Sequence, residues 1–213
     1  IWNDLCFGII YNSDLFEEAG VSPPKDWNDF LNVCKKLQDK GIAPMTAGLK
    51  DAHVNSWVAY MIMVNDCFAK DPDVYEKINR RELTFSEADA IRSSLDKFQQ
   101  LVDNGILNMD HLGLAYGDAM TVFAQGKAAM VPDGSFAVPA IMAANPDIKL
   151  GSFSIPGDNG ESTVWGSLGM TYSVNKNISD EKKAAAKEFL SFMLDKTVSK
   201  EFSEATALFT TLS

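Results

Sequence analysis

The segment HVNSWVAYMIMVNDCF, residues 53–68, places the strongest constraint on how this chain can fold. It is almost wholly apolar over a length that suits a helix rather than a strand. A helix that is apolar all round must be buried on most of its sides. Other elements of the chain therefore have to surround it.

Most of those other elements are predicted to be helices with recognisable ends. Helices are predicted over residues 12–20, 26–41, 71–81, 86–105, 116–125, 137–144 and 179–195. N-cap residues are predicted at Asn12, Asp26, Ser86 and Ser179. Helix-terminating glycines are predicted at Gly20, Gly41 and Gly105.

The predicted strands are short by comparison. They lie at residues 7–11, at 42–49 and at 128–131, where Pro132 is expected to end the strand. From about residue 147 the chain alternates and turns, and residues 163–174 predict either two strands or one strand broken by glycines. The order of these elements predicts a helix-rich α/β fold. The strands are too short for a parallel sheet of the dinucleotide-binding kind.

Charge and hydropathy exclude several classes of partner. The formal net charge of −10 argues against binding to nucleic acid or to an anionic membrane, because both need clustered Lys and Arg. No apolar run approaches the roughly 18 residues that span a bilayer. The first residues, IWNDLCFGIIYNSD, contain neither an initiator Met nor a signal-type stretch, so we expect the chain to be a piece of a longer protein.

No motif predicts catalysis. His53 and His111 lack the spacing of metal ligands, and no pair of acids stands out for glycoside hydrolysis. A nucleophile elbow, a P-loop and a dinucleotide fingerprint are all missing from the sequence. Cys6, Cys34 and Cys67 predict no disulfide framework, and Cys34 is expected to be buried. We therefore predict no catalytic residue, no metal and no cofactor.

What remains is a set of aromatic residues beside polar residues and glycines. Trp57 lies near the start of the apolar helix, Phe136 follows Asp133-Gly134-Ser135, and Trp165 precedes Gly166. For each of these three residues the alternative to ligand contact is packing in the core, and for Trp57 the two interpretations have equal weight. Flat aromatic faces stack on the C–H face of a sugar ring, and polar groups bind its hydroxyls. A pocket that combines the two is typical of a small-ligand site.

Three segments in this order resemble the extracellular solute-binding proteins of ABC importers, in particular the sugar-binding family that includes maltose-binding protein. The segments are GIIYNSDLFEEAGVSPPKDWNDFLNVCKKL, VFAQGKAAMVPDGSF and VWGSLGMTYSVNKNISDEKKAAAKEFLSFM. Together they cover nearly the whole chain. The aromatic at position 136 is Phe, where many relatives have Trp, so that stacking is kept and the indole N–H is lost.

The resemblance implies a periplasmic-binding-protein fold of type II, with two lobes joined by a hinge and incomplete in this chain. Residues 1–147 would form most of the C-terminal lobe, and residues 148–213 a hinge strand and part of the N-terminal lobe. The ligand would lie between lobes that close by hinge bending. Ligand-binding residues are then expected at Asn55, Trp57, Asp133, Ser135, Phe136 and Trp165.

The resemblance also implies a function. The expected role is the substrate-binding component of an ABC transporter, which binds a mono- or oligosaccharide outside the cytoplasmic membrane and delivers it to permease subunits. The intact protein would be extracellular or periplasmic, with a lipid anchor as one option. A ligand-sensing domain for a membrane partner and a carbohydrate-active enzyme are the alternatives. Exposed strand edges are expected to let this chain associate with itself.

Overall fold

The computed structural model describes residues 3–168, 171–206 and 209–210. The chain forms two compact units. Unit 1 consists of Ile1–Cys6, Gly134–Ala140 and Gly166–Ser213, and unit 2 of Phe7–Asp133 and Ile141–Trp165. The predicted assignment of residues 1–147 and 148–213 to two lobes stays a prediction.

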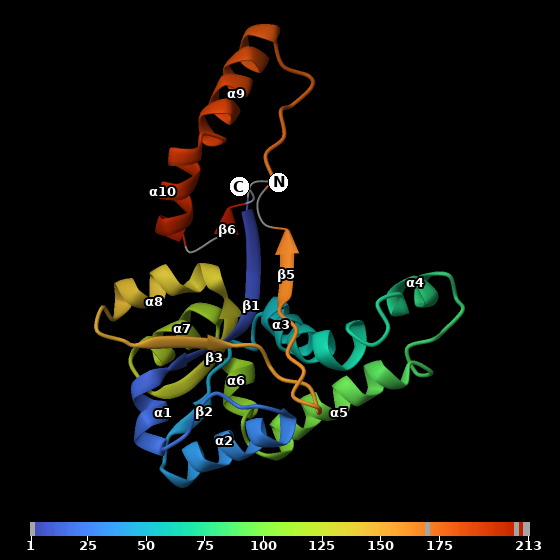
Figure 1. The fold of residues 1–213 in the computed structure, drawn as a ribbon, viewed down its shortest axis with the longest axis vertical. Coiled ribbons are helices and arrows are strands. Elements are labelled where there is room, and N and C mark those ends of the chain that lie inside the picture. Colours follow the sequence, from blue (N-terminus) through green and yellow to red (C-terminus); the bar gives the residue numbers. More distant parts are fainter. Residues whose placement is uncertain (1–2, 169–170, 207–208, 211–213) are drawn as a thin grey trace. The chain divides into compact units, whose positions relative to one another are not determined.

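A mixed sheet organises the strands (Figure 1). The strands are β1 (Asn3–Asn12), β2 (Ala43–Met45), β3 (Ala128–Gly134), β4 (Leu150–Phe153), β5 (Trp165–Leu168) and β6 (Phe209–Thr210). Their order is β2-β3-β1-β4, and β5 and β6 also pair with β1. β2 and β3 run parallel with Met45 opposite Met130, whereas β1 and β4 run antiparallel with Ile9 opposite Phe153.

Helices make up most of the remaining chain. In unit 2 they are α1 (Ser13–Ala19), α2 (Trp27–Asp39), α3 (Ala52–Met63), the π-helix η1 (Val64–Phe68), α4 (Val74–Asn79), α5 (Asp89–Asp103), α6 (Met109–Gly113) and α7 (Tyr116–Ala124). The 3-10 turn η2 (Ser135–Ala137), α9 (Asp180–Met193) and α10 (Lys196–Thr206) belong to unit 1. α8 (Val138–Ala144) begins in unit 1 and ends in unit 2. The expectation of a helix-rich α/β fold is confirmed.

Local capping chemistry explains where several helices begin and end. The Asn12 side chain accepts a hydrogen bond from the Asp14 N–H at 3.0 Å, and Gly20 ends α1 in the left-handed region at φ 66°. Ser179 caps α9 as predicted. The predicted cap at Ser86 is wrong, because α5 begins only at Asp89. Thr84 and Glu87 form a separate turn there, with Thr84 Oγ1 2.6 Å from Glu87 Oε2.

The predicted end of the third strand at Pro132 is also wrong, since β3 continues to Gly134. Residues 128, 130 and 132 alternate with their neighbours along β3, so the backbone N of Pro132 points to the same side as those of Ala128 and Met130, which pair with β2. β2 ends at Met45, and its last contact is the Thr46 N–H donating to Met130 O at 2.9 Å. A proline N without hydrogen therefore costs no ladder bond at this position.

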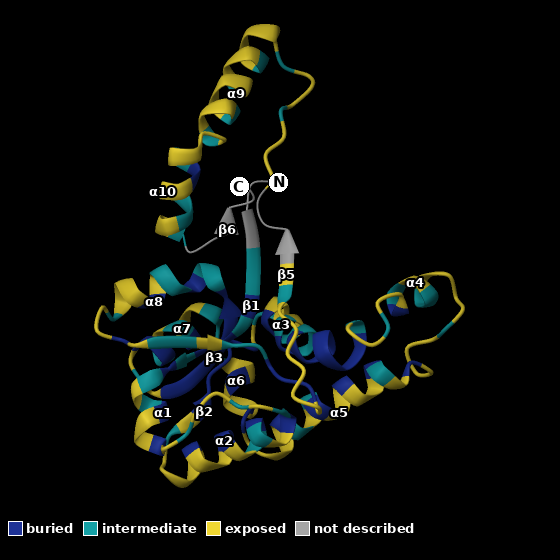
Figure 2. Ribbon diagram, viewed as in Figure 1, coloured by how far each residue is buried: buried dark blue, intermediate teal, exposed yellow. Residues whose placement is uncertain are grey.

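The core of unit 2 lies between the sheet and its helices. α3 and η1 pack on α5, and α2 packs on β2. Every residue of β3 is buried (Figure 2), and Phe30 of α2 and Phe123 of α7 are fully buried. Cys34 is buried as predicted. The apolar helix is buried throughout residues 61–67, while its first turns keep exposed positions.

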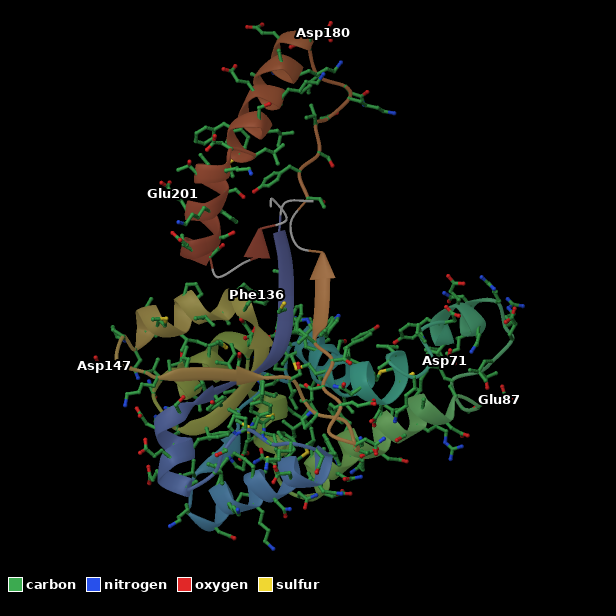
Figure 3. All side chains as sticks on the ribbon, in the orientation of Figure 1. Asp71, Glu87, Phe136, Asp147, Asp180 and Glu201 are labelled. Atoms are coloured by element: carbon green, nitrogen blue, oxygen red, sulfur yellow. The ribbon has the colours of Figure 1, made fainter. Side chains whose placement is uncertain are left out.

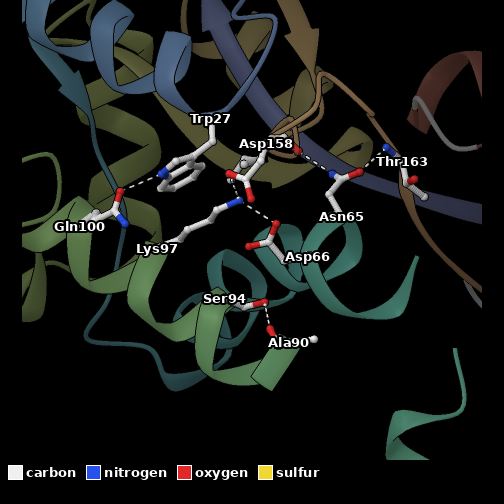
Figure 4. A network of polar contacts seen from close by, with 10 residues as sticks. Trp27, Asn65, Asp66, Ala90, Ser94, Lys97, Gln100, Asp158 and Thr163 are labelled. Atoms are coloured by element: carbon white, nitrogen blue, oxygen red, sulfur yellow. Dashed lines mark hydrogen bonds and ion pairs between the residues drawn. The ribbon is translucent and has the colours of Figure 1, made fainter. Parts of the chain in front are cut away.

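Unit 2 also contains a buried ion pair, shown in Figure 4. Lys97 of α5 and Asp66 of η1 are 5% and 2% exposed, and Lys97 Nζ lies 2.7 Å from Asp66 Oδ1. The same ammonium lies 2.8 Å from Asp158 and 5.2 Å from the centre of the Trp27 ring. Trp27 in turn donates its indole N–H to Gln100 at 2.8 Å. The two helices are therefore joined by charge as well as by apolar packing.

His111 holds the end of β2 against α6. Its Nδ1 accepts the Asn108 N–H at 3.0 Å, and its Nε2 lies 3.2 Å from Met45 O, a carbonyl that can only accept. The ring is therefore neutral with its proton on Nε2. Burial, the largest cause, lowers the pKa of His111 below its ordinary value.

We predict that Lys97→Met destabilises the full-length protein by about 3–5 kcal/mol, because it leaves Asp66 charged, buried and unpaired. Lys97→Met combined with Asp66→Asn should recover most of that loss, since the pair is then removed together. Urea unfolding followed by tryptophan fluorescence measures both. Equal destabilisation by the single and the double variant would contradict the interpretation.

We also predict a pH-dependent effect of His111→Asn. The asparagine oxygen can still accept from Asn108, but the bond to Met45 is lost, at a cost of about 1–2 kcal/mol at pH 7.5. Because the folded pKa is lowered, the unfolded state binds more protons below about pH 6.5, and the native protein loses stability there as pH falls. The difference between native and variant should thus shrink towards pH 5.5. An unchanged difference between pH 7.5 and pH 5.5 would contradict this interpretation.

Candidate functional site

Trp165 is the first residue of β5 and is half-buried. Its ring stacks on Phe7 of β1, with centroids 4.2 Å apart and planes at 21°. It also stacks on Tyr60 of α3 at 5.3 Å and 24°. The ring is thus held in one orientation by two aromatic neighbours from different elements.

Trp57 joins the same group of rings. It lies one helical turn before Tyr60, and its ring is 5.3 Å from Phe7 at 52°. Tyr116 of α7 meets it edge-on at 5.9 Å and 89°, and His53 meets it edge-on at 4.8 Å. We call Phe7, His53, Trp57, Tyr60, Tyr116 and Trp165 the aromatic cluster. The structure thus brings two of the predicted site residues, Trp57 and Trp165, onto one shared neighbour.

Asn55 and Asp133 hold neighbouring parts of unit 2. The Asn55 amide donates to Leu49 O at 2.9 Å and secures the turn that precedes α3. Asp133 is 1% exposed and accepts a hydrogen bond from the Tyr116 hydroxyl. Burial first, and then the charge and hydrogen bond of Asp133, raise the pKa of Tyr116. Asp133 therefore contacts the aromatic cluster through Tyr116.

Ser135 and Phe136 belong to unit 1 and form the turn η2 (Figure 3). The Phe136 ring folds back over Gly134, where an added Cβ would lie 2.2 Å from Phe136 Cε1. A side chain at position 134 would collide with the Phe136 ring in this conformation, which explains the glycine there. Ser135 Oγ is buried without a hydrogen-bond partner among the residues that the structure describes.

Phe7, Tyr60, Tyr116 and His53 were not among the predicted site residues. His53 and Tyr60 stand four and three positions from Trp57, so helical spacing alone could have placed them beside it. Phe7 comes from a strand and Tyr116 from a distant helix, and local spacing carries no signal for either.

A separate cavity of about 230 Å³ lies beside β2 and the start of β3. Its walls include Met45, Asn108 and His111. Their polar groups already bond to one another, as described above, and none of the predicted site residues lines it. The aromatic cluster, rather than this cavity, is the candidate site.

Two chemical roles find no support in the described part of the chain. Among those residues, no group of three or more His, Cys, Asp and Glu could hold a metal ion. No helix there is both long and apolar enough to cross a membrane.

Comparison with known proteins gives consistent matches. The family model described as "Bacterial extracellular solute-binding protein" matches residues 2–200. The chain is 26% identical to the multiple sugar-binding protein of Streptococcus mutans over 181 residues, which cover 83% of this chain and 43% of that protein. It is 24% identical over 207 residues to the melibiose/raffinose/stachyose-binding protein MelE of Bacillus subtilis, with 94% and 47% covered.

Solved structures match over the whole chain. A chitin oligosaccharide binding protein superposes with a TM-score of 0.86 at 24% identity, over 99% of this chain and 53% of that one. The solute-binding protein RafE in complex with raffinose superposes with a TM-score of 0.79 at 25% identity, over 100% and 55%. The chain therefore spans about half the length of the proteins that it matches.

Proposed function

The chain belongs to the bacterial extracellular solute-binding protein family, and we propose that the protein binds a mono- or oligosaccharide as the substrate-binding component of an ABC importer. The family is one of binding proteins, and the proposed role is binding without catalysis. The protein would act outside the cytoplasmic membrane, with a lipid anchor as one way of holding it there.

The aromatic cluster is the observation that carries this proposal. Trp57 and Trp165 are both half-buried and both contact Phe7, so neither residue is fully enclosed while its orientation is set. A pyranose ring offers an apolar face of C–H groups, which pairs with such a surface. Orienting the rings before binding lowers the entropy that a ligand must remove.

Polar contacts would come from residues around the cluster. Asn55 and Tyr116 are both half-buried. The Tyr116 hydroxyl donates a hydrogen bond to Asp133. We also propose Phe136 as a stacking ring and Ser135 as a hydroxyl partner for the ligand of the full-length protein. The relatives are named for sugars of several lengths, including raffinose and stachyose, which supports an oligosaccharide among the candidates.

The proposed partners are a sugar and the permease subunits of the importer. In the full-length protein both halves of the fold would be present, and a sugar could be enclosed between lobes. For the present chain alone we propose weak or absent affinity for sugar. Association of this chain with itself through strand edges stays a prediction.

We predict that isothermal titration calorimetry of the full-length protein will detect binding in a panel of raffinose, stachyose, maltose and chitin oligosaccharides. Trp165→Leu should weaken the binding of the best sugar by about 10- to 100-fold, because it removes the proposed stacking ring, whose burial by a ligand is worth about 1.5–3 kcal/mol. Phe85→Leu, at an exposed aromatic outside the cluster, is the matched control and should bind normally. Binding of an amino acid or a peptide with no response to any sugar would refute the carbohydrate assignment.

A further inference from the structure

The apolar helix contains two polar residues at its most buried part. Asn65 and Asp66 lie in the π-helix η1 and are 4% and 2% exposed. The wide turn is seen in the Ala69 N–H, which donates to Val64 O five residues earlier at 3.0 Å. Buried polar groups are costly unless they are hydrogen-bonded, and single π-turns occur often at functional sites. The partners of these two side chains therefore need an explanation.

The Asn65 side chain closes a loop. Its Nδ2 donates to Ile155 O at 2.6 Å, and its Oδ1 accepts from the Thr163 N–H at 2.7 Å (Figure 4). The carbonyl can only accept and the N–H can only donate, so the orientation of the amide is determined. One side chain thus holds both ends of residues 155–163, which we call the strap.

The strap is also closed from within and packed at its base. The Gly157 N–H donates to Glu161 O at 2.8 Å. Gly157 O accepts from the backbone N–H of Trp27 at 3.2 Å. A Cβ added to Gly157 would lie 3.4 Å from the Cβ of Asn65. Gly157 therefore lies next to the π-turn, within van der Waals reach of Asn65.

A second attachment comes from the neighbouring residue of η1. Asp66 pairs with Lys97 at 2.7 Å, and the same Lys97 ammonium reaches Asp158 of the strap at 2.8 Å. The Asp66 carboxylate is buried, whereas the Asp158 side chain is about half exposed. The strap is therefore bound to η1 directly by Asn65 and indirectly through Lys97.

The strap leads directly into the aromatic cluster. Thr163, whose N–H is held by Asn65, stands two residues before Trp165, and only the exposed Val164 lies between them. Consecutive Cα atoms are 3.8 Å apart, so fixing Thr163 confines the start of β5 within a short reach. The stacking of Trp165 on Phe7 and Tyr60 then selects one ring orientation within that reach.

We infer that Asn65 is a positioning residue for the ligand site, which acts through the strap to set the place of Trp165; this role in binding rests on the proposed function. The buried π-turn η1 fixes the position of Asn65. Asn65 fixes the strap, and the strap fixes the backbone that leads into Trp165. The alternative is that the two hydrogen bonds of Asn65 stabilise the strap and have no influence on the position of the Trp165 ring.

The test uses the full-length protein labelled with 5-fluorotryptophan and examined by fluorine NMR without ligand. Trp165→Phe assigns the resonance of Trp165. Asn65→Leu removes both bonds to the strap at similar side-chain volume. Thr163→Pro removes the bond nearest Trp165 at an exposed residue of the strap and replaces no buried side chain, so it remains informative if the first variant fails to fold. Ser94→Ala, which removes a buried hydroxyl whose bond to Ala90 O lies within α5, is the matched control.

We predict that Asn65→Leu and Thr163→Pro shift and broaden the Trp165 resonance, whereas Ser94→Ala leaves it unchanged. For a sugar that binds the native protein, the first two variants should raise Kd by about tenfold, the loss expected when part of one stacking contact is removed. An unmoved Trp165 resonance in both variants would overturn the positioning role.

Two further outcomes separate this inference from the proposed function. A displaced Trp165 resonance with unchanged sugar affinity would overturn the role of Asn65 in binding and leave the sugar-binding assignment intact. If the native protein binds no sugar, the proposed function fails, and the ligand-free resonances still decide whether Asn65 positions Trp165.

Discussion

The buried ion pair between Lys97 and Asp66 is the interaction on which the rest of unit 2 depends. Each charge would be strongly destabilising alone, so the pair holds α5 and η1 in one arrangement with little tolerance for displacement. η1 continues α3, so the same pair limits where Trp57 and Tyr60 can lie. Apolar packing alone specifies a register less sharply, because apolar surfaces can slide over one another at smaller cost.

Segments that lie far apart in the chain contribute the residues of the candidate site. β1 contributes Phe7, α3 contributes Trp57 and Tyr60, α7 contributes Tyr116 and β5 contributes Trp165. The rings orient one another, and one oxygen of the buried Asp133 accepts a hydrogen bond from the Tyr116 hydroxyl. A surface prepared in this way suits a ligand with one apolar face, which agrees with the sugar-binding relatives.

Unit 1 has a different character. α9 contains no buried residue among those that the structure describes, and its Phe189 and Phe192 are more than half exposed. The chain spans about half the length of its relatives, so a match over nearly all of this chain still describes only part of a whole solute-binding protein.

Local patterns in the sequence predicted the elements whose causes are themselves local. The caps at Asn12, Gly20 and Ser179 follow from hydrogen bonds within a few residues. The cap at Ser86 failed because Thr84 and Glu87 form a competing turn, and the end at Pro132 failed because the neighbouring strand was already complete. The second failure could be seen only with the partner strand in place.

The sequence by itself determined the helix-rich α/β class, the family and the two tryptophans of the candidate site, because composition, spacing and ordered motifs are properties of the chain alone. Only the tertiary structure decided that Trp57 and Trp165 share Phe7, that Asp133 is buried and bonded to the Tyr116 hydroxyl, and that Asn65 holds both ends of the strap. These contacts join residues up to more than a hundred positions apart, and their strength depends on distance and burial, which only the folded chain defines.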